Sequence, residues 1–437
     1  MQNETALQRQ LLRFAKVEPR ETAAVVAAFC LFFFVLGSYF AVRPVRETVA
    51  TLLGRDRVAD LWLYTALFAI LIVPLYGWLI ARFRRSILLP WVYGTVAVIL
   101  GVIGFNIQMD ESNLRVGTFF YVWISVLNLM LVSVFWSFLL EMFSAEQTKR
   151  LFGFIAAGGT FGALVGPLIA RLSVESIGNS GVLYVGSVGF LGAIVCQRIL
   201  IGIWNRERSE RVAGTADGSV VAADAGLGGN PLAGIFIVLR SPYLLGIASF
   251  VVLLSAVNTF LYFEQLRIVT ETFEDTTRRT EVFATIDFVV QFLTIFSQLF
   301  LTGRIASKLG VRTLLTFVPV LMVVGFLLLS MFNVFGMIAA LLVLRRWGEY
   351  AFIRPGREML WGSLDTESKY KAKSFIDVPV YRAADYVGAQ AKTALDAVGT
   401  SPSGAALIGA ILGVLWVANG WLLGRKHDES SKEKNTT

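Results

Sequence analysis

Long apolar segments separated by short polar stretches run through almost the whole chain. A helix rises 1.5 Å per residue and a bilayer core is about 30 Å thick, so a segment needs roughly 20 apolar residues to cross it. Twelve segments meet this requirement, and they predict an all-α polytopic membrane protein with twelve transmembrane helices. The predicted spans are 22–46, 60–81, 86–107, 118–142, 151–172, 181–204, 243–264, 282–303, 310–331, 333–358, 374–398 and 403–424.

The composition supports a membrane protein. Of 437 residues, 56% are hydrophobic and only 16% are charged. Such a chain has too little charged surface for a soluble multidomain protein, so lipid must form part of its solvent.

A polar stretch rich in Gly, Ala, Ser and Asp, near 205–232, divides the spans six and six. We therefore predict a major-facilitator-like 6+6 arrangement, in which each half consists of two inverted three-helix repeats. The predicted parts are a cytoplasmic N-terminal segment (1–21), an N-terminal six-helix bundle (22–204), a cytoplasmic linker (205–242), a C-terminal six-helix bundle (243–424) and a cytoplasmic tail (425–437).

Lys and Arg are unevenly distributed between alternate loops. Short cytoplasmic loops carry the excess of these residues in membrane proteins. With the N-terminus inside, the outer loops contain only Arg55, Arg57, Arg115, Arg278 and Arg279. We therefore expect a multi-pass protein of the bacterial inner (cytoplasmic) membrane with both termini in the cytoplasm. The net charge of +8 then reflects this topology and anionic lipid, not nucleic-acid binding.

A charged motif occurs twice, as Arg43-Pro44-Val45-Arg46-Glu47 and as Arg354-Pro355-Gly356-Arg357-Glu358. The copies fall in predicted helices 1 and 10, which are equivalent in the 6+6 arrangement. Proline removes a backbone donor and disfavours the helical conformation of the preceding residue. We therefore expect Arg43 and Arg354 to interrupt their helices, as is common at transporter binding sites.

In the 6+6 arrangement, predicted spans 22–46, 118–142, 243–264 and 333–358 are equivalent, because each begins one of the four three-helix repeats. Each of them ends its apolar run in a charge: Arg46, Glu141, Glu264 and Arg357. The topology places Arg46 and Glu264 near the outer face, and Glu141 and Arg357 near the inner face. Our hypothesis is that these two Arg–Glu pairs are alternating gates. The alternative is that the four side chains anchor helix ends at the membrane interface.

Further ionisable residues lie inside the predicted spans 333–358 and 374–398. A charge within the membrane is costly unless it faces protein or water. Arginine suits phosphate or carboxylate oxygens, so this set predicts an anionic substrate. Intramolecular salt bridges are the alternative interpretation of the helix 11 charges. The candidate residues for substrate binding or gating are Arg43, Arg46, Glu47, Glu141, Glu264, Arg345, Arg346, Glu349, Arg354, Arg357, Glu358, Asp377, Arg382 and Asp385.

The stretch from Tyr39 to Thr51 and the stretch from Arg354 to Arg382 resemble the ATP:ADP antiporters of intracellular bacteria and plastids. The second stretch includes Leu364-Asp365, Lys371-Ala372-Lys373 and Ile376-Asp377-Val378. The resemblance implies twelve spans and nucleotide exchange. It also implies roles in exchange for the charges of helices 1, 4, 7 and 10. The family typically has Lys where Arg46 and Arg357 stand.

We therefore expect a secondary-active transporter that exchanges ATP and ADP, or a related phosphorylated anion, by alternating access. Its expected partners are a small anionic substrate and the bilayer, without nucleic acid, and a monomer is plausible. A proton-coupled symporter or exporter of another organic anion is the first alternative. A membrane-embedded enzyme or sensor is the second, disfavoured because His427 is the single histidine. We expect no enzymatic activity, no cofactor and no metal.

Overall fold

A computed structural model describes residues 18, 21–83, 85–212, 233–363, 372–373 and 375–436. All regular secondary structure within these ranges is helical. The buried side chains are mostly apolar, while many large apolar side chains are exposed along the helices. The chain is therefore an all-α polytopic membrane protein.

Contacts divide the chain into two compact units. Unit 1 comprises Met1–Leu52, Leu67–Ala223 and Asp275–Phe288, and unit 2 comprises Leu53–Ala66, Asp224–Glu274 and Val289–Thr437. Each unit contains most of one predicted six-helix bundle together with a short stretch of the other bundle. The first part of α3 (Arg55–Arg82) belongs to unit 2, and the first part of α9 (Thr276–Ser297) belongs to unit 1.

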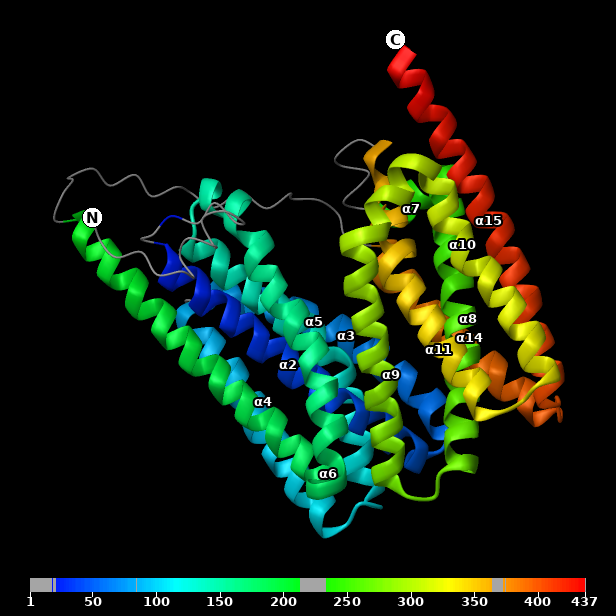
Figure 1. The fold of residues 1–437 in the computed structure, drawn as a ribbon, viewed down its shortest axis with the longest axis horizontal. Coiled ribbons are helices and arrows are strands. Elements are labelled where there is room, and N and C mark those ends of the chain that lie inside the picture. Colours follow the sequence, from blue (N-terminus) through cyan, green and yellow to red (C-terminus); the bar gives the residue numbers. More distant parts are fainter. Residues whose placement is uncertain are drawn as a thin grey trace. The chain divides into compact units, whose positions relative to one another are not determined.

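Unit 1 is built mainly from four long helices (Figure 1). They are α2 (Thr22–Leu53), α4 (Arg85–Met109), α5 (Leu114–Met142) and α6 (Ala145–Val212). Helix α4 packs against both α5 and α6. The 68-residue α6 contains two helices joined at Gly178, whose φ of 68° lies in the region that favours glycine. Predicted spans 151–172 and 181–204 lie on either side of this glycine.

Helices α2 and α6 approach closely along a row of glycines. A Cβ at Gly158, Gly162 or Gly166 would lie 2.3 Å from a carbonyl oxygen of α2, at Phe29, Phe33 and Gly37 respectively. No other residue fits there without a shift of the backbone. Small residues permit such packing in membranes, where van der Waals contact drives helix association.

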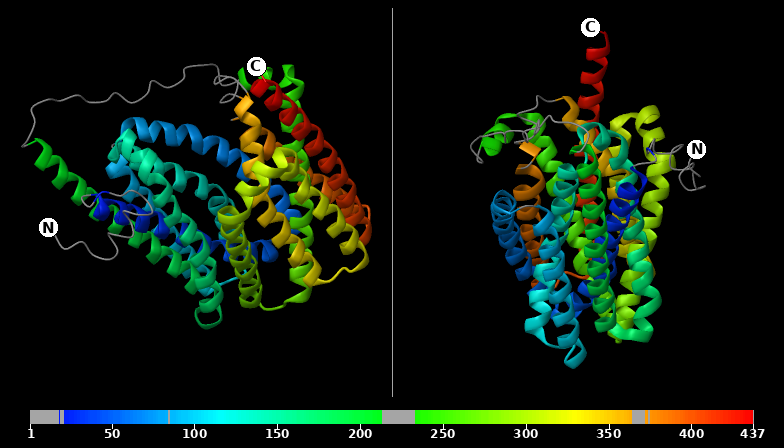
Figure 2. Two further views of the ribbon diagram at one scale, coloured as in Figure 1. Left: turned by 45° about the horizontal axis from the view of Figure 1, so that its top comes forward. Right: turned by 90° about the vertical axis from the view of Figure 1, so that its left-hand side faces the viewer.

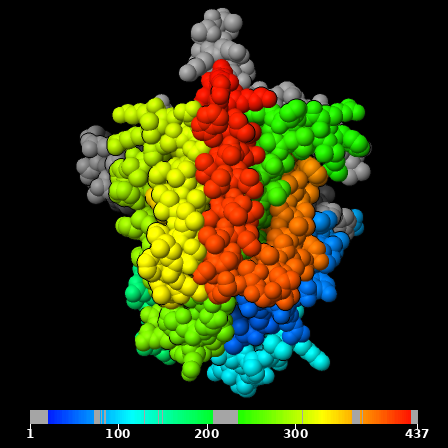
Figure 3. Space-filling model, turned by 90° about the vertical axis from the view of Figure 1, so that its right-hand side faces the viewer, coloured from blue at the N-terminus to red at the C-terminus, as the bar shows by residue number. Residues whose placement is uncertain are grey.

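In unit 2, α15 packs along α10 and against α8, and α14 packs against α8. Figures 1 and 2 show α15 beside α10, and in Figure 3 α15 forms a red column between yellow and orange segments. The elements are α7 (Ala233–Arg240), α8 (Pro242–Thr272), η1 (Gln298–Thr302), α10 (Gly303–Met331), α11 (Phe335–Gly348), η2 (Glu349–Ile353), α12 (Arg354–Leu360), η3 (Trp361–Ser363), η4 (Ile376–Val380), α14 (Tyr381–Ala397) and α15 (Pro402–Thr436).

Eight helices in the described ranges are long and apolar enough to cross a membrane. One of them, Arg150–Arg206, holds the two predicted spans that meet at Gly178. Helices α3, α11 and α14 are not among the eight. The count of twelve spans therefore stays a prediction.

The predicted interruption at Arg43 is wrong, because α2 continues through Pro44 to Leu53. Membrane helices tolerate an internal proline, because neighbouring helices and local adjustments satisfy the backbone groups that it frees. The predicted interruption at Arg354 is wrong as well, because Arg354 has helical backbone angles (φ −61°, ψ −51°) and only the helix type changes there. The wider turns of η2 end at Ile353, and α12 begins at Arg354.

Two predicted polar segments are helical where they are described. The linker 205–242 begins in α6, which extends to Val212, contains α7 and ends at Pro242, the first residue of α8. Residues 213–232 lie outside the described residues, as does most of 1–21. The predicted tail from 425 continues α15.

Candidate functional site

The first charged motif lies on α2 in unit 1. The Arg43 guanidinium is 3.7 Å from the Asp287 carboxylate of α9. Arg46 pairs with Glu47, donates to the Ser125 hydroxyl at 3.2 Å and lies 5.5 Å from the centre of the Tyr121 ring. The Arg43 and Arg46 side chains are 17% and 15% exposed. Both arginines therefore face protein partners and retain some access to solvent.

The second motif lies in unit 2, where η2 leads into α12. The buried Glu349 carboxylate accepts from Arg345 at 2.9 Å and from Arg354 at 3.2 Å. Arg345 and Glu349 lie one turn apart, as the sequence predicts, and Arg346 is also buried. One carboxylate thus holds two guanidinium groups.

Arg354 combines a buried partner with an exposed side chain. Its side chain is 56% exposed, although Glu349 is only 9% exposed. The guanidinium carbon lies 4.6 Å from the centre of the Tyr350 ring. Stacking and the Glu349 contact hold the guanidinium in one orientation.

Three more predicted residues form ion pairs in or beside this motif. Arg357 on α12 is 3.2 Å from Asp377 on η4. Glu358 is 2.5 Å from the Lys373 amine. These contacts tie α12 to the residues before α14, so Arg357, Asp377 and Glu358 act within one local cluster.

Helix α14 carries Arg382 and Asp385. Asp385 is buried and accepts a hydrogen bond of 2.5 Å from Ser255 of α8, and Arg382 is 3.6 Å away. Both the salt-bridge interpretation and the prediction that these charges face protein agree with this geometry.

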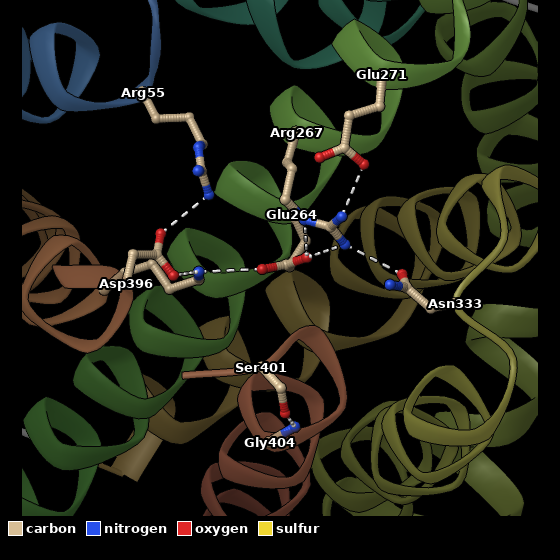
Figure 4. Close-up of polar contacts among 9 residues, drawn as sticks. Arg55, Glu264, Arg267, Glu271, Asn333, Asp396, Ser401 and Gly404 are labelled. Atoms are coloured by element: carbon tan, nitrogen blue, oxygen red, sulfur yellow. Dashed lines mark hydrogen bonds and ion pairs between the residues drawn. The ribbon is translucent and has the colours of Figure 1, made fainter. Parts of the chain in front are cut away.

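Glu264 on α8 lies at the centre of a charged network (Figure 4). Its carboxylate is 3.0 Å from Lys392 of α14 and 2.9 Å from Arg267. Lys392 also pairs with Asp396, which is 3.0 Å from Arg55 at the start of α3. The network joins three helices of unit 2.

Glu141 differs from the other three predicted gate residues. It is exposed in the last turn of α5, whereas Arg46, Glu264 and Arg357 have polar partners inside their own units. The pairing of Glu141 with Arg357, and that of Arg46 with Glu264, stay predictions.

Sequence reasoning missed Asp287, Arg267 and Asp396 as members of these clusters. Asp287 was detectable, since it is an ionisable residue inside predicted span 282–303. Arg267 and Asp396 lie at span ends, where an ordinary interfacial charge has the same sequence pattern. In the described part of the chain, no group of three His, Cys, Asp or Glu side chains is placed to bind a metal.

No protein-family model matches the sequence, and no curated protein matches it. Solved structures of membrane transporters do resemble it. A mutant of the nucleoside transporter NupG has a TM-score of 0.64 at 12% identity, covering 92% of this chain and 99% of its own. A bacterial homologue of the iron transporter ferroportin, in an inward-facing state, has a TM-score of 0.59 at 13% identity and coverage of 91% and 98%. A bacterial homologue of the human lysosomal transporter Spinster has a TM-score of 0.57 at 12% identity and coverage of 94% and 98%.

The chain therefore has the fold of these major-facilitator-like transporters. At such low identities the likeness extends to the fold alone. The resemblance to the ATP:ADP antiporters, and with it the substrate, stays a prediction.

Proposed function

We propose that this chain is a secondary transporter that exchanges a phosphorylated anion, foremost ATP for ADP, by alternating access. The observation that carries the proposal is the Arg354 arrangement. The Arg354 side chain is 56% exposed, and its guanidinium contacts the Glu349 carboxylate and stacks on the Tyr350 ring. Guanidinium groups bind phosphate oxygens through two parallel hydrogen bonds. The fold of the structural neighbours supports a transporter without specifying its substrate.

The local charge balance supports an anionic substrate. Glu349 contributes one negative charge against the two positive charges of Arg345 and Arg354. Arg357 is balanced by Asp377. An anion that binds Arg354 therefore adds negative charge where the nearest pairs leave a positive excess.

Counterflow in proteoliposomes tests the proposal. Purified protein is reconstituted with unlabelled ATP or ADP inside, and labelled ATP is added outside. We expect uptake that requires internal nucleotide and is lost in Arg354→Gln. Exposed Arg425, which pairs with Glu429 on α15, provides the matched control Arg425→Gln. Nucleotide uptake that proceeds equally into empty liposomes contradicts exchange.

The nucleoside transporter among the structural neighbours makes adenosine an essential competitor in this assay. Phosphate recognition by Arg354 predicts that excess ADP suppresses labelled ATP uptake and that adenosine does not. Equal suppression by both compounds would favour nucleoside recognition. Inorganic phosphate and a sugar phosphate extend the same comparison.

Proton-coupled transport of an anion is the second candidate. The buried Asp385 carboxylate favours it, because a hydroxyl and one more distant guanidinium are its nearest partners. Such a group can exchange a proton during a transport cycle. In liposomes without internal nucleotide, uptake driven by an imposed pH gradient and lost in Asp385→Asn would support this candidate.

The proposed location is the bacterial inner membrane, with both termini in the cytoplasm. Impermeant maleimide labelling of Ser112→Cys in the α4–α5 loop of intact cells tests the orientation. We expect labelling from outside, because this loop is predicted to face outward.

A further inference from the structure

The first turns of α9 pack against α2 and α6 through polar contacts inside unit 1. The hydroxyl oxygens of Thr280 and Thr48 are 2.6 Å apart, and the Thr280 hydroxyl donates to the Asn179 side-chain oxygen at 2.6 Å. All three residues are buried. Three helices thus meet at one threonine.

Contacts on either side extend this polar interface. Glu111 accepts from Asn179 at 2.6 Å and from Thr276 at 2.9 Å, and Arg279 donates to the Thr51 hydroxyl at 2.9 Å. Polar surfaces regain hydrogen bonds to water when they separate, whereas apolar surfaces lose their stabilisation. The interface is therefore suited to repeated opening.

The ion pair of Arg43 and Asp287 belongs to the same interface and lies two turns beyond Thr280 along α9. Asp287 is 2% exposed, and its carboxylate is 3.7 Å from the Arg43 guanidinium. This separation is longer than that of a close charge-assisted hydrogen bond. Arg43 also belongs to the repeated charged motif, so a carboxylate of α9 lies where an anionic substrate has its predicted partner.

We propose that Asp287 stands in for the anionic substrate at Arg43, and that substrate binding at Arg43 releases the first turns of α9 from α2. Asp287 is a positioning residue in this scheme. The inference rests on the proposed function, because it requires an anionic substrate. It adds the step that couples substrate binding to movement of α9.

The test measures how fast a cysteine at the buried position of Thr280 reacts with maleimide in purified full-length protein. Cys30 and Cys196 are first replaced by serine to remove their thiols. Without substrate, we expect Thr280→Cys to react slowly, and about tenfold faster when Asp287→Asn is added. ATP accelerates labelling when Asp287 is present and has little further effect in the Asp287→Asn background.

Glu281 provides the matched control on the same helix. It pairs with exposed Arg278 at 2.6 Å, so Glu281→Gln removes a carboxylate whose ion pair lies within α9. We expect it to leave the labelling rate unchanged and Asp287→Glu to restore slow labelling. If Asp287→Asn does not elute as folded, monodisperse protein, Arg43→Gln replaces it. That substitution removes the α2 member of the same ion pair.

Unchanged labelling in folded Asp287→Asn or Arg43→Gln protein overturns the inference, as does an equal acceleration by Glu281→Gln. This result is independent of nucleotide exchange, because the rates are compared without substrate. If wild-type protein fails to exchange ATP while Asp287→Asn still accelerates labelling, the proposed substrate is wrong and the positioning role of Asp287 is supported. Inorganic phosphate then replaces ATP as the anion probe.

Discussion

Lys392 and Glu264 form a buried ion pair between α14 and α8. The amine nitrogen is 3.0 Å from the carboxylate oxygen, and the two side chains are 2% and 4% exposed. Lys392 also lies 5.3 Å from the centre of the Phe260 ring. A buried charge is costly unless it is paired, so each side chain makes the other tolerable inside unit 2.

We predict that Lys392→Met and Glu264→Gln each lower the free energy of unfolding by up to about 3 kcal/mol, because each leaves a buried charge with one partner fewer. The double variant should cost less than the sum of the single variants, since it removes both charges. Denaturant unfolding in detergent measures these differences. Arg425→Gln, in the exposed pair with Glu429, should change stability by less than about 0.5 kcal/mol. Strict additivity of the two buried substitutions would contradict a direct coupling.

A second prediction concerns the contact between α2 and α6. A Cβ at Gly162 would lie 2.3 Å from the Phe33 carbonyl oxygen, whereas a Cβ at Gly153 meets nothing within 4 Å. Gly162→Ala should therefore separate the helices and lower the unfolding temperature. Gly153→Ala should be neutral or stabilising by up to about 1 kcal/mol, because alanine favours helix. Equal unfolding temperatures for the two variants would show that the close approach is unimportant.

A third prediction concerns pH and Glu21, which precedes α2. Burial raises the pKa of Glu21, but hydrogen bonds from Gln147, the Glu18 backbone and Arg150 outweigh it, so the pKa lies below its usual value of 4.5. The stabilisation is fully present above pH 4.5 and is lost as the pH falls through the lowered pKa. Glu21→Gln should therefore reduce the unfolding temperature at pH 7 and reduce it less below pH 4. A constant difference across that range would contradict the linkage.

The length of the apolar segments predicted the all-α membrane fold, because a spanning segment must satisfy its backbone hydrogen bonds internally and a helix does so. The prediction of a helix break at Pro44, which came from the backbone chemistry of proline, was wrong. A local rule predicts a break there, yet α2 continues through Pro44 to Leu53. Proline in a membrane helix therefore identifies a distortion less reliably than it does in a soluble protein.

The candidate site was predictable where charges lie one helical turn apart. Arg345 and Glu349 form the pair that their spacing indicates. Partners far apart in sequence were not predictable, because spacing contains no information on which helices meet. Arg43 with Asp287, and Glu264 with Lys392, depend on how α9 and α14 pack.

The final prediction separates the charge of Arg354 from its shape. Arg354→Lys keeps the positive charge but loses the planar group that contacts Glu349 and stacks on Tyr350. A charge-assisted hydrogen bond contributes about 1.5–3 kcal/mol, so nucleotide affinity should fall roughly 10- to 150-fold. Arg354→Gln should weaken it further.

Thermal shift at several ATP concentrations measures this affinity, because stabilisation follows the ratio of ligand concentration to Kd. Since Glu349 keeps Arg345 as a partner, ligand-free Arg354→Lys protein should unfold near the wild-type temperature. The two measurements distinguish a binding role from a structural one. A large loss of ligand-free stability with unchanged affinity would assign Arg354 to packing, whereas the opposite result assigns its guanidinium to the substrate.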